Sequence, residues 1–102
     1  MKRIEAVIPP ETVTIVTEAL MNVGVGGVTV LHGMGKSGDP KLQVLTLRPR
    51  ETLLTVVDDS RVKDVINTIL DLVSTNSPND GIVFVSPVEN ALYIGSKMKM
   101  DR

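Results

Sequence analysis

The 102-residue sequence contains no cysteine. A disulfide framework and a thiolate zinc site are therefore excluded. There is no tryptophan either, and Phe84 and Tyr93 are the only aromatic residues. The hydrophobic core must therefore be built from valine, isoleucine and leucine. Side chains that branch at Cβ pack well on the pleated surface of a sheet, so this composition favours a core that includes strands.

Long apolar runs are also missing. None approaches the roughly 20 residues that a membrane-spanning helix needs, so no membrane insertion is expected. Glu5 and the pair Pro9 and Pro10 interrupt the N-terminal segment, which does not have the pattern of a signal peptide. We therefore expect a cytoplasmic protein. The net charge is −1, and basic residues are spread along the chain without interleaved aromatics. This pattern argues against a nucleic-acid partner.

Groups that could carry catalysis are few. His32 is the only histidine, and no second histidine or cysteine lies at metal-ligand spacing, so no metal site is expected. No nucleophile–base pair can be assembled around it. Asp58 and Asp59 precede a helical pattern, where capping is the better interpretation of two carboxylates. Acylphosphatase chemistry would need an arginine in the first loop, which carries Pro9, Pro10 and Glu11 instead. We expect no enzymatic activity.

The length fits a single domain over residues 1–102. The patterns predict strands at 2–8, 26–31, 52–57 and 81–85, the last of them buried, and helices at 11–23 and 62–73. They also predict loops at 33–40 and 74–80 and a turn at 48–50. A short strand or ribbon is expected at 42–47, and residues 91–94 are a candidate for one more short strand.

The second helix has the clearest pattern. Its apolar stripe recurs at helical spacing and consists of Val62, Val65, Ile66, Ile69, Leu70 and Val73. Asp58 and Ser60 lie where an N-cap is expected. The first helix ends at Gly24, because glycine tolerates the left-handed conformation that closes many helices.

The elements fall into two successive strand–helix–strand units. Two such units side by side give an α+β, ferredoxin-like βαββαβ sandwich, an antiparallel sheet with two helices on one face. The helices cover only that face. The other face is apolar as well, so it needs a cover, which another subunit could provide.

Five segments resemble, in their order and spacing, the PII signal-transduction proteins, the family of nitrogen regulatory protein P-II. These segments are MKRIEAVI at 1–8, EAL at 18–20, GVTV at 27–30, VVDD at 56–59 and NDGIVFVSPVE at 79–89. The resemblance covers roughly residues 1–36 and 51–92. It implies a homotrimer that regulates a partner transporter or metabolic enzyme through a T-loop, here about 34–50, and a mobile tail at 96–102.

The resemblance also implies that clefts between subunits hold a small-molecule effector, an adenine nucleotide (ADP, AMP or ATP), as a non-covalent regulatory ligand. The residues that it assigns to the adenine pocket are Val7, Thr29 and Val56. The base of the T-loop would be Gly33, Met34, Gly35, Lys36 and Ser37, and the phosphate-side B-loop would be Asn79, Asp80 and Gly81. Glycines at a loop base would let backbone amides approach a phosphate as an anion-binding nest.

The sequence departs from the family at three positions. A lysine and two arginines that bind phosphates in family members are replaced by Ile82, Tyr93 and Gly95. Such charge-assisted bonds contribute about 1.5–3 kcal/mol each, so triphosphate binding should be weak. Lys36, Arg48, Arg50 or Lys97 could substitute. An alternative is a trimer that senses a non-nucleotide metabolite or an anion such as bicarbonate.

Overall fold

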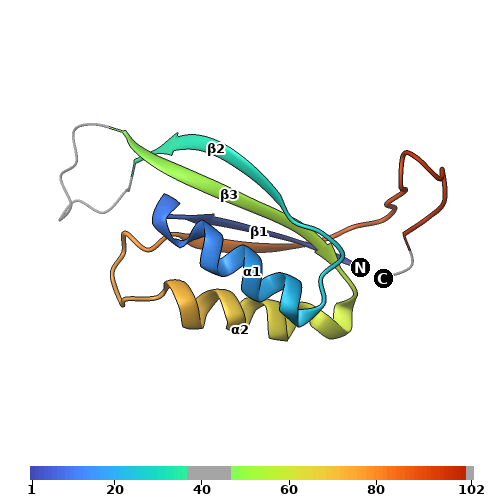
Figure 1. Ribbon diagram of the computed structural model, residues 1–102, viewed down its shortest axis with the longest axis horizontal. Coiled ribbons are helices and arrows are strands. Elements are labelled where there is room, and N and C mark those ends of the chain that lie inside the picture. The colour runs from blue at the N-terminus through green and yellow to red at the C-terminus, as the bar shows by residue number, and fades with distance from the viewer. Residues whose placement is uncertain (37–46, 101–102) are drawn as a thin grey trace.

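The computed structural model describes residues 1–36 and 47–100. A sheet forms one layer and two helices lie together on one of its faces (Figure 1). The elements are β1 (Lys2–Ile8), η1 (Pro10–Thr12), α1 (Val13–Val23), β2 (Thr29–Gly35), β3 (Arg48–Val57), η2 (Asp59–Arg61), α2 (Val62–Val73) and β4 (Ile82–Pro87). The strand order is β2-β3-β1-β4, and neighbours are antiparallel. The predicted ferredoxin-like architecture is confirmed.

The core lies between the sheet and the helices. Ile4, Ala6 and Ile8 of β1 alternate with partly or fully exposed residues, so one face of the strand is buried under the helices. The buried apolar side chains are Ile4, Ala6, Ile8, Val16, Leu20, Val25, Leu53, Val57, Val65, Ile69 and Val73. None of them is aromatic, as the composition required. The buried Thr55 hydroxyl donates a hydrogen bond to the Gly27 carbonyl at 2.7 Å.

The helix ends follow the sequence signals. Gly24 adopts φ +98° and its amide donates to the last turn of α1, as expected of a left-handed C-cap. Arg61 Nη1 donates to the Val23 carbonyl at 2.7 Å, which satisfies another group of that turn. The Asp58 carboxylate accepts from the Ser60 amide and so caps η2, the turn that leads into α2. The first helix begins as a 3₁₀ turn at Pro10 and becomes α-helical only at Val13.

The predicted boundaries of the two strands of the β2–β3 hairpin are wrong. Gly33 and Gly35 are not loop residues: β2 begins at Thr29 and continues through Gly35. Arg48, Pro49 and Arg50 do not form a turn, because β3 begins at Arg48 and pairs there with β2. Pro49 fits this strand because β1 pairs with β3 only as far as Glu51, so no ladder bond is lost on that side. The prediction for 42–47 falls mostly outside the described residues.

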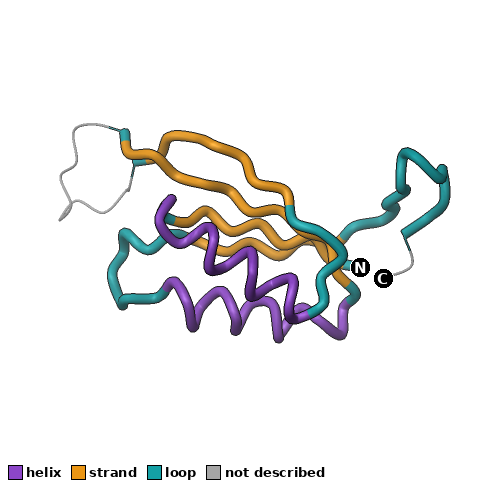
Figure 2. Tube along the Cα trace, viewed as in Figure 1, coloured by secondary structure: helices purple, strands orange, loops and turns teal. Residues whose placement is uncertain are grey.

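Two predictions for the C-terminal quarter also need correction. The last strand is β4, and it is not buried: Ile82 and Phe84 are about half exposed. Residues 91–94 do not form a strand, and only the single bridge between Leu92 and Lys99 occurs there. Residues 88–100 instead form an arm that extends beyond the end of the sheet (Figure 2). Within this arm the Tyr93 amide donates to the Met98 carbonyl at 3.0 Å.

The sheet face opposite the helices is called the open face below. Strand alternation places on it Arg3, Glu5, Val7, Thr29, Leu31, Arg48, Arg50, Thr52, Leu54, Val56, Ile82, Phe84 and Ser86. It is more polar than predicted, with apolar side chains among polar and charged ones, and no other part of the described chain covers it (Figure 1). Among the described residues, no helix has the length and apolarity needed to cross a bilayer.

Candidate functional site

Two segments far apart in the sequence meet at one end of the sheet. The first is the hairpin root, defined as residues 33–35 of β2 and 48–50 of β3, and the second is the loop 74–81 between α2 and β4. Arg50 Nη2 donates a hydrogen bond to Asn79 Oδ1 at 2.7 Å, and both residues are half-buried. The C-terminal end of the predicted T-loop and the predicted B-loop are therefore in direct contact within one chain.

The loop 74–81 is folded around the Asp80 carboxylate. It accepts hydrogen bonds from the Thr75 amide and hydroxyl, both at 2.6 Å, and from the Ser77 amide at 3.2 Å. These bonds, that of the Thr75 hydroxyl first, lower the pKa of Asp80 below its ordinary value because they stabilise the charged form. The Asp80 amide itself donates to the Ser77 carbonyl at 3.1 Å. Asp80 thus orders the loop, and its amide is engaged within that turn.

Gly81 is required where the loop meets β1. Its φ is +117°, a conformation that residues with a side chain rarely adopt. A Cβ atom at this position would lie 1.9 Å from the Val7 carbonyl oxygen. The backbone of the loop therefore lies close against the backbone of β1, at one of the predicted pocket residues.

The glycines of the hairpin root have a different role from the one predicted. Gly33 pairs with Arg50 and Gly35 pairs with Arg48 in an extended antiparallel ladder, which does not form a concave nest of amides. A Cβ on Gly35 would lie 3.3 Å from Cγ of Arg50, a tight contact. Gly35 therefore leaves room for the Arg50 side chain.

The other predicted site residues separate into groups. Val7, Thr29 and Val56 all lie on the open face. Val7 is opposite Thr52 on β3, whereas Val56 is four residues further along, roughly 14 Å away. One chain therefore brings Thr29 near Val56 but does not bring Val7 to them. Lys36 is exposed, Met34 faces the other side of the sheet, and Ser37 lies outside the described residues.

Three features at this end of the molecule were not predicted. The first is the bond between Arg50 and Asn79. The second is a contact between His32 Nδ1 and the Glu51 carboxylate, which the register places directly opposite each other. Arg50 and Asn79 belong to segments predicted as a turn and a loop, and His32 and Glu51 were assigned to no element. Extending the pairing of β2 with β3 would have placed His32 opposite Glu51, but it would not have brought Asn79 to Arg50.

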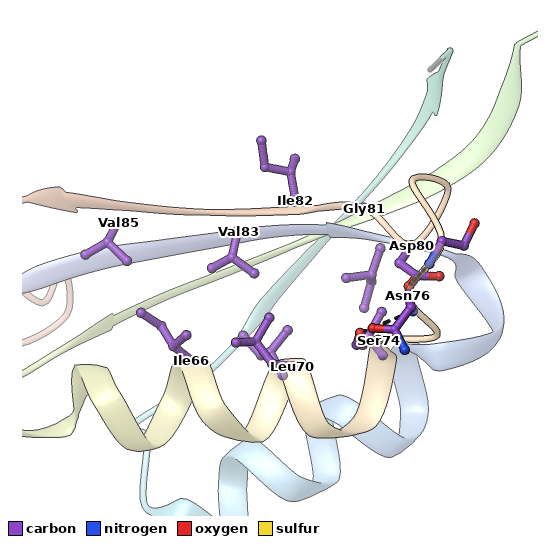
Figure 3. A pocket seen from close by; sticks show the side chains of 13 residues that line it. Ile66, Leu70, Ser74, Asn76, Asp80, Gly81, Ile82, Val83 and Val85 are labelled. Carbon is purple, nitrogen blue, oxygen red and sulfur yellow. Dashed lines mark hydrogen bonds between the residues drawn. The ribbon is translucent and has the colours of Figure 1, made fainter. Parts of the chain in front are cut away.

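The third unpredicted feature is a pocket of about 500 Å³ between α2 and β4. In Figure 3, apolar side chains of α2 face those of β4 across it, and polar residues of the loop 74–81 close one end. The labelled residues are Ile66, Leu70, Ser74, Asn76, Asp80, Gly81, Ile82, Val83 and Val85. Side chains from several elements form this pocket, so no single sequence pattern indicates it.

The three departures from the family pattern lie at the open face and on the arm. Ile82 points away from the helices at the start of β4, and Tyr93 is half exposed on the arm beside Ile94 and Gly95. None of the three provides a positive charge, so an anion near the loop 74–81 must be bound by other cations. Arg50 is the cation that the structure places in contact with this loop.

The chain matches the model of the family described as "Nitrogen regulatory protein P-II" over residues 1–97. It belongs to this family. A nitrogen regulatory protein P-II of Azospirillum brasilense is 35% identical over 92% of this chain and 91% of its own length. The corresponding protein of Nostoc punctiforme is also 35% identical with the same coverage. A "Nitrogen fixation nifHD region GlnB-like protein 1" of Methanothermococcus thermolithotrophicus is 30% identical over 92% and 93% of the two chains.

Membership of the P-II family explains the architecture. The match includes both strand–helix–strand units, the hairpin root and the loop 74–81. Proteins of this family are regulators in signal transduction and generally form trimers. The resemblance recognised from the five sequence segments is therefore confirmed, and the chain is a nitrogen regulatory signal-transduction protein of the P-II type.

Proposed function

We propose that this P-II family member is a cytoplasmic homotrimer that binds an adenine nucleotide in clefts between its subunits. It signals nucleotide occupancy to a partner transporter or metabolic enzyme through its β2–β3 connection. The observation that carries the proposal is the family match over residues 1–97, which spans every proposed contact. The geometry of the open face and the arm supports the assembly, and that of the hairpin root supports the binding of a ligand.

The apolar surface of the single chain supports the assembly. Leu31, Ile82 and Phe84 on the open face are each about half exposed. On the arm, Ile94 is 95% exposed and Leu92 is 57% exposed. Exposed apolar side chains of this kind are what an interface between copies would bury. Burial against other copies would remove it from water, at about 25 cal/mol of stabilisation per Å².

The positions of the polar and apolar groups support a ligand at the edge of that assembly. Val7 offers apolar contact beside the loop 74–81, and Arg50 brings a positive charge to the same loop. Thr29 and Val56 lie toward the other end of the open face. In the proposed cleft, one subunit contributes the Val7 end and the next subunit contributes Thr29 and Val56.

The residues at the three positions that depart from the family pattern limit how well the cleft distinguishes nucleotides by their number of phosphates. A charge-assisted hydrogen bond contributes about 1.5–3 kcal/mol, and about 1.4 kcal/mol corresponds to tenfold in affinity. Because positions 82, 93 and 95 carry no positive charge, the second and third phosphates add little to the binding affinity. We expect AMP, ADP and ATP to bind with similar affinity, and ATP should have no large advantage.

Isothermal titration with AMP, ADP and ATP tests the proposal. The variant Thr29→Val, which removes a hydroxyl that would bond the purine edge, should weaken binding by about tenfold. Thr14→Val is the matched control, because Thr14 is exposed on α1 and should leave binding unchanged. If none of the three nucleotides produces heat with the wild-type protein, the nucleotide proposal is wrong.

The missing phosphate contacts also favour a second candidate function. The same cleft could bind a non-nucleotide metabolite or a small anion such as bicarbonate, for which Arg50 alone provides the charge. Titration with bicarbonate under the same conditions separates the two candidates. Heat from bicarbonate together with none from the nucleotides would select the second candidate.

A further inference from the structure

The Arg50 side chain occupies a prepared position between two loops. Its Nη1 donates to the Pro49 carbonyl at 2.9 Å, and its Nη2 donates to Asn79 Oδ1 at 2.7 Å. A guanidinium carries five N–H donors in a fixed planar arrangement. These two bonds use two of the donors and fix the orientation of the plane. Arg50 is half-buried, whereas Lys36 and Arg48 nearby are exposed.

The strand partners of Arg50 are compatible with this position. Gly33 lies directly opposite Arg50, and Gly35 faces its aliphatic stem, so neither neighbour brings a side chain into the space that the arginine occupies. With a Cβ on Gly35, Cγ of Arg50 would have to shift by a few tenths of an ångström. The two glycines thus serve the placement of one guanidinium.

The acceptor that holds the guanidinium is neutral. An arginine bonded to a carboxylate would be neutralised and held tightly, whereas an amide oxygen leaves the full positive charge in place. An anion adds charge attraction to the hydrogen bond and accepts from two N–H groups of the guanidinium at once, whereas the Asn79 oxygen accepts from Nη2 alone. An anionic group that reaches Arg50 therefore competes with the Asn79 amide for Nη2.

We propose that Arg50 is the specificity-determining residue of the ligand site at the loop 74–81, and that Asn79 is a neutral stand-in acceptor which an anionic ligand displaces. The ligand class is a phosphate-bearing molecule or another small oxyanion. The inference builds on the proposed function for the place of the ligand. It adds which residue recognises the anion and how that residue is held ready for it.

Inorganic pyrophosphate is the probe for this inference, because it has the charge of the ligand and lacks the adenine. Its binding is followed by NMR at the Arg50 Nε–H and the Asn79 side-chain amide. In the wild-type protein both signals should shift with the same dissociation constant, since the anion forms a bond to one group and breaks the bond to the other. Absence of a shift at either signal overturns the inference.

Two pairs of variants give the decisive comparison. Asn79→Asp provides a charged acceptor that holds Arg50, so pyrophosphate affinity should fall by about tenfold. Asn76→Asp adds the same charge to the same loop without touching Arg50, so its effect should stay below about threefold, from screened repulsion alone. Arg50→Gln should weaken binding by at least about tenfold, whereas Arg48→Gln, two residues away, should change it by less than about threefold.

The results distinguish a failure of this inference from a failure of the proposed function. If Asn79→Asp binds pyrophosphate as well as Asn76→Asp does, Arg50 is structural and the inference is wrong. The same holds if nucleotides bind but Arg50→Gln binds them as tightly as the wild type. If pyrophosphate behaves as expected and the nucleotides bind no more tightly than pyrophosphate, the adenine part of the proposed function fails and the role of Arg50 stands.

Discussion

Replacement of Gly81 by alanine should destabilise the protein strongly. At φ +117° a residue with a side chain is strained by about 1–3 kcal/mol. The new Cβ would also lie 1.9 Å from the Val7 carbonyl oxygen. That atom belongs to the backbone of β1, so the clash cannot be relieved by a rotamer change. Overpacking of this kind costs a further 1–3 kcal/mol or so. We expect a total loss of about 2–6 kcal/mol in the free energy of unfolding.

Urea unfolding followed by circular dichroism measures this loss. With a typical slope of about 2 kcal/mol per molar urea, the midpoint should fall by about 1–3 M. Gly26→Ala is the matched control: Gly26 is exposed and a methyl group there would meet no atom within 4 Å, so its effect should stay within about 0.5 kcal/mol. Both variants are measured at one protomer concentration. Equal midpoints for the two variants would refute the close approach of the loop to β1.

The remaining predictions concern pH and assembly. Hydrogen bonds from Thr75 and Ser77 lower the pKa of Asp80 in the folded state. The contribution of Asp80 to the stability of the fold is therefore complete above the pKa of the unfolded state, and it is lost as the pH falls through the pKa of the folded state. Between pH 5 and about pH 3, the wild type should therefore lose stability more steeply than Asp80→Asn does; parallel curves in thermal unfolding would contradict this. Phe84→Glu places a charge opposite Glu5 on the open face and should dissociate the proposed trimer, as measured by light scattering. Met21→Glu, at a similarly exposed position on α1, should leave it intact, and an assembled Phe84→Glu variant would exclude the open face as the interface.

The sequence predicted the elements whose signals are local. The stripe of α2 has Val65 and Ile69 in the core, and Asp58 caps the turn before it, because a helix satisfies its own backbone and shows its buried face as a period. The alternation along β1 predicted its buried face for a similar reason: Ile4 and Ala6 lie on the same face of the strand, whichever strands it pairs with. The order of the fold followed from these elements, and the family was recognised from the five segments that resemble it.

The hairpin root could not be predicted because strand pairing is not local. Gly33 and Pro49 are residues that favour loops and turns, and they become strand residues only because each pairs across the ladder between β2 and β3. The exposure of β4 was missed for a related reason. An apolar strand such as the one with Ile82 and Phe84 looks the same in sequence whether its own chain or another copy buries it.

The division of the site residues along the open face connects ligand binding with assembly. Val7 and the Arg50–Asn79 contact lie at one end of a chain, while Val56 lies roughly 14 Å along the sheet from Val7. In the proposed cleft, a ligand that touches both groups lies between two copies. Such a ligand binds the assembled state better than the separate chains, and by thermodynamic linkage it strengthens the assembly by the factor by which assembly strengthens its own binding. The open face and the recognition of the ligand are then two parts of one equilibrium, so a substitution at Phe84 that separates the copies weakens ligand binding without a contact to the ligand.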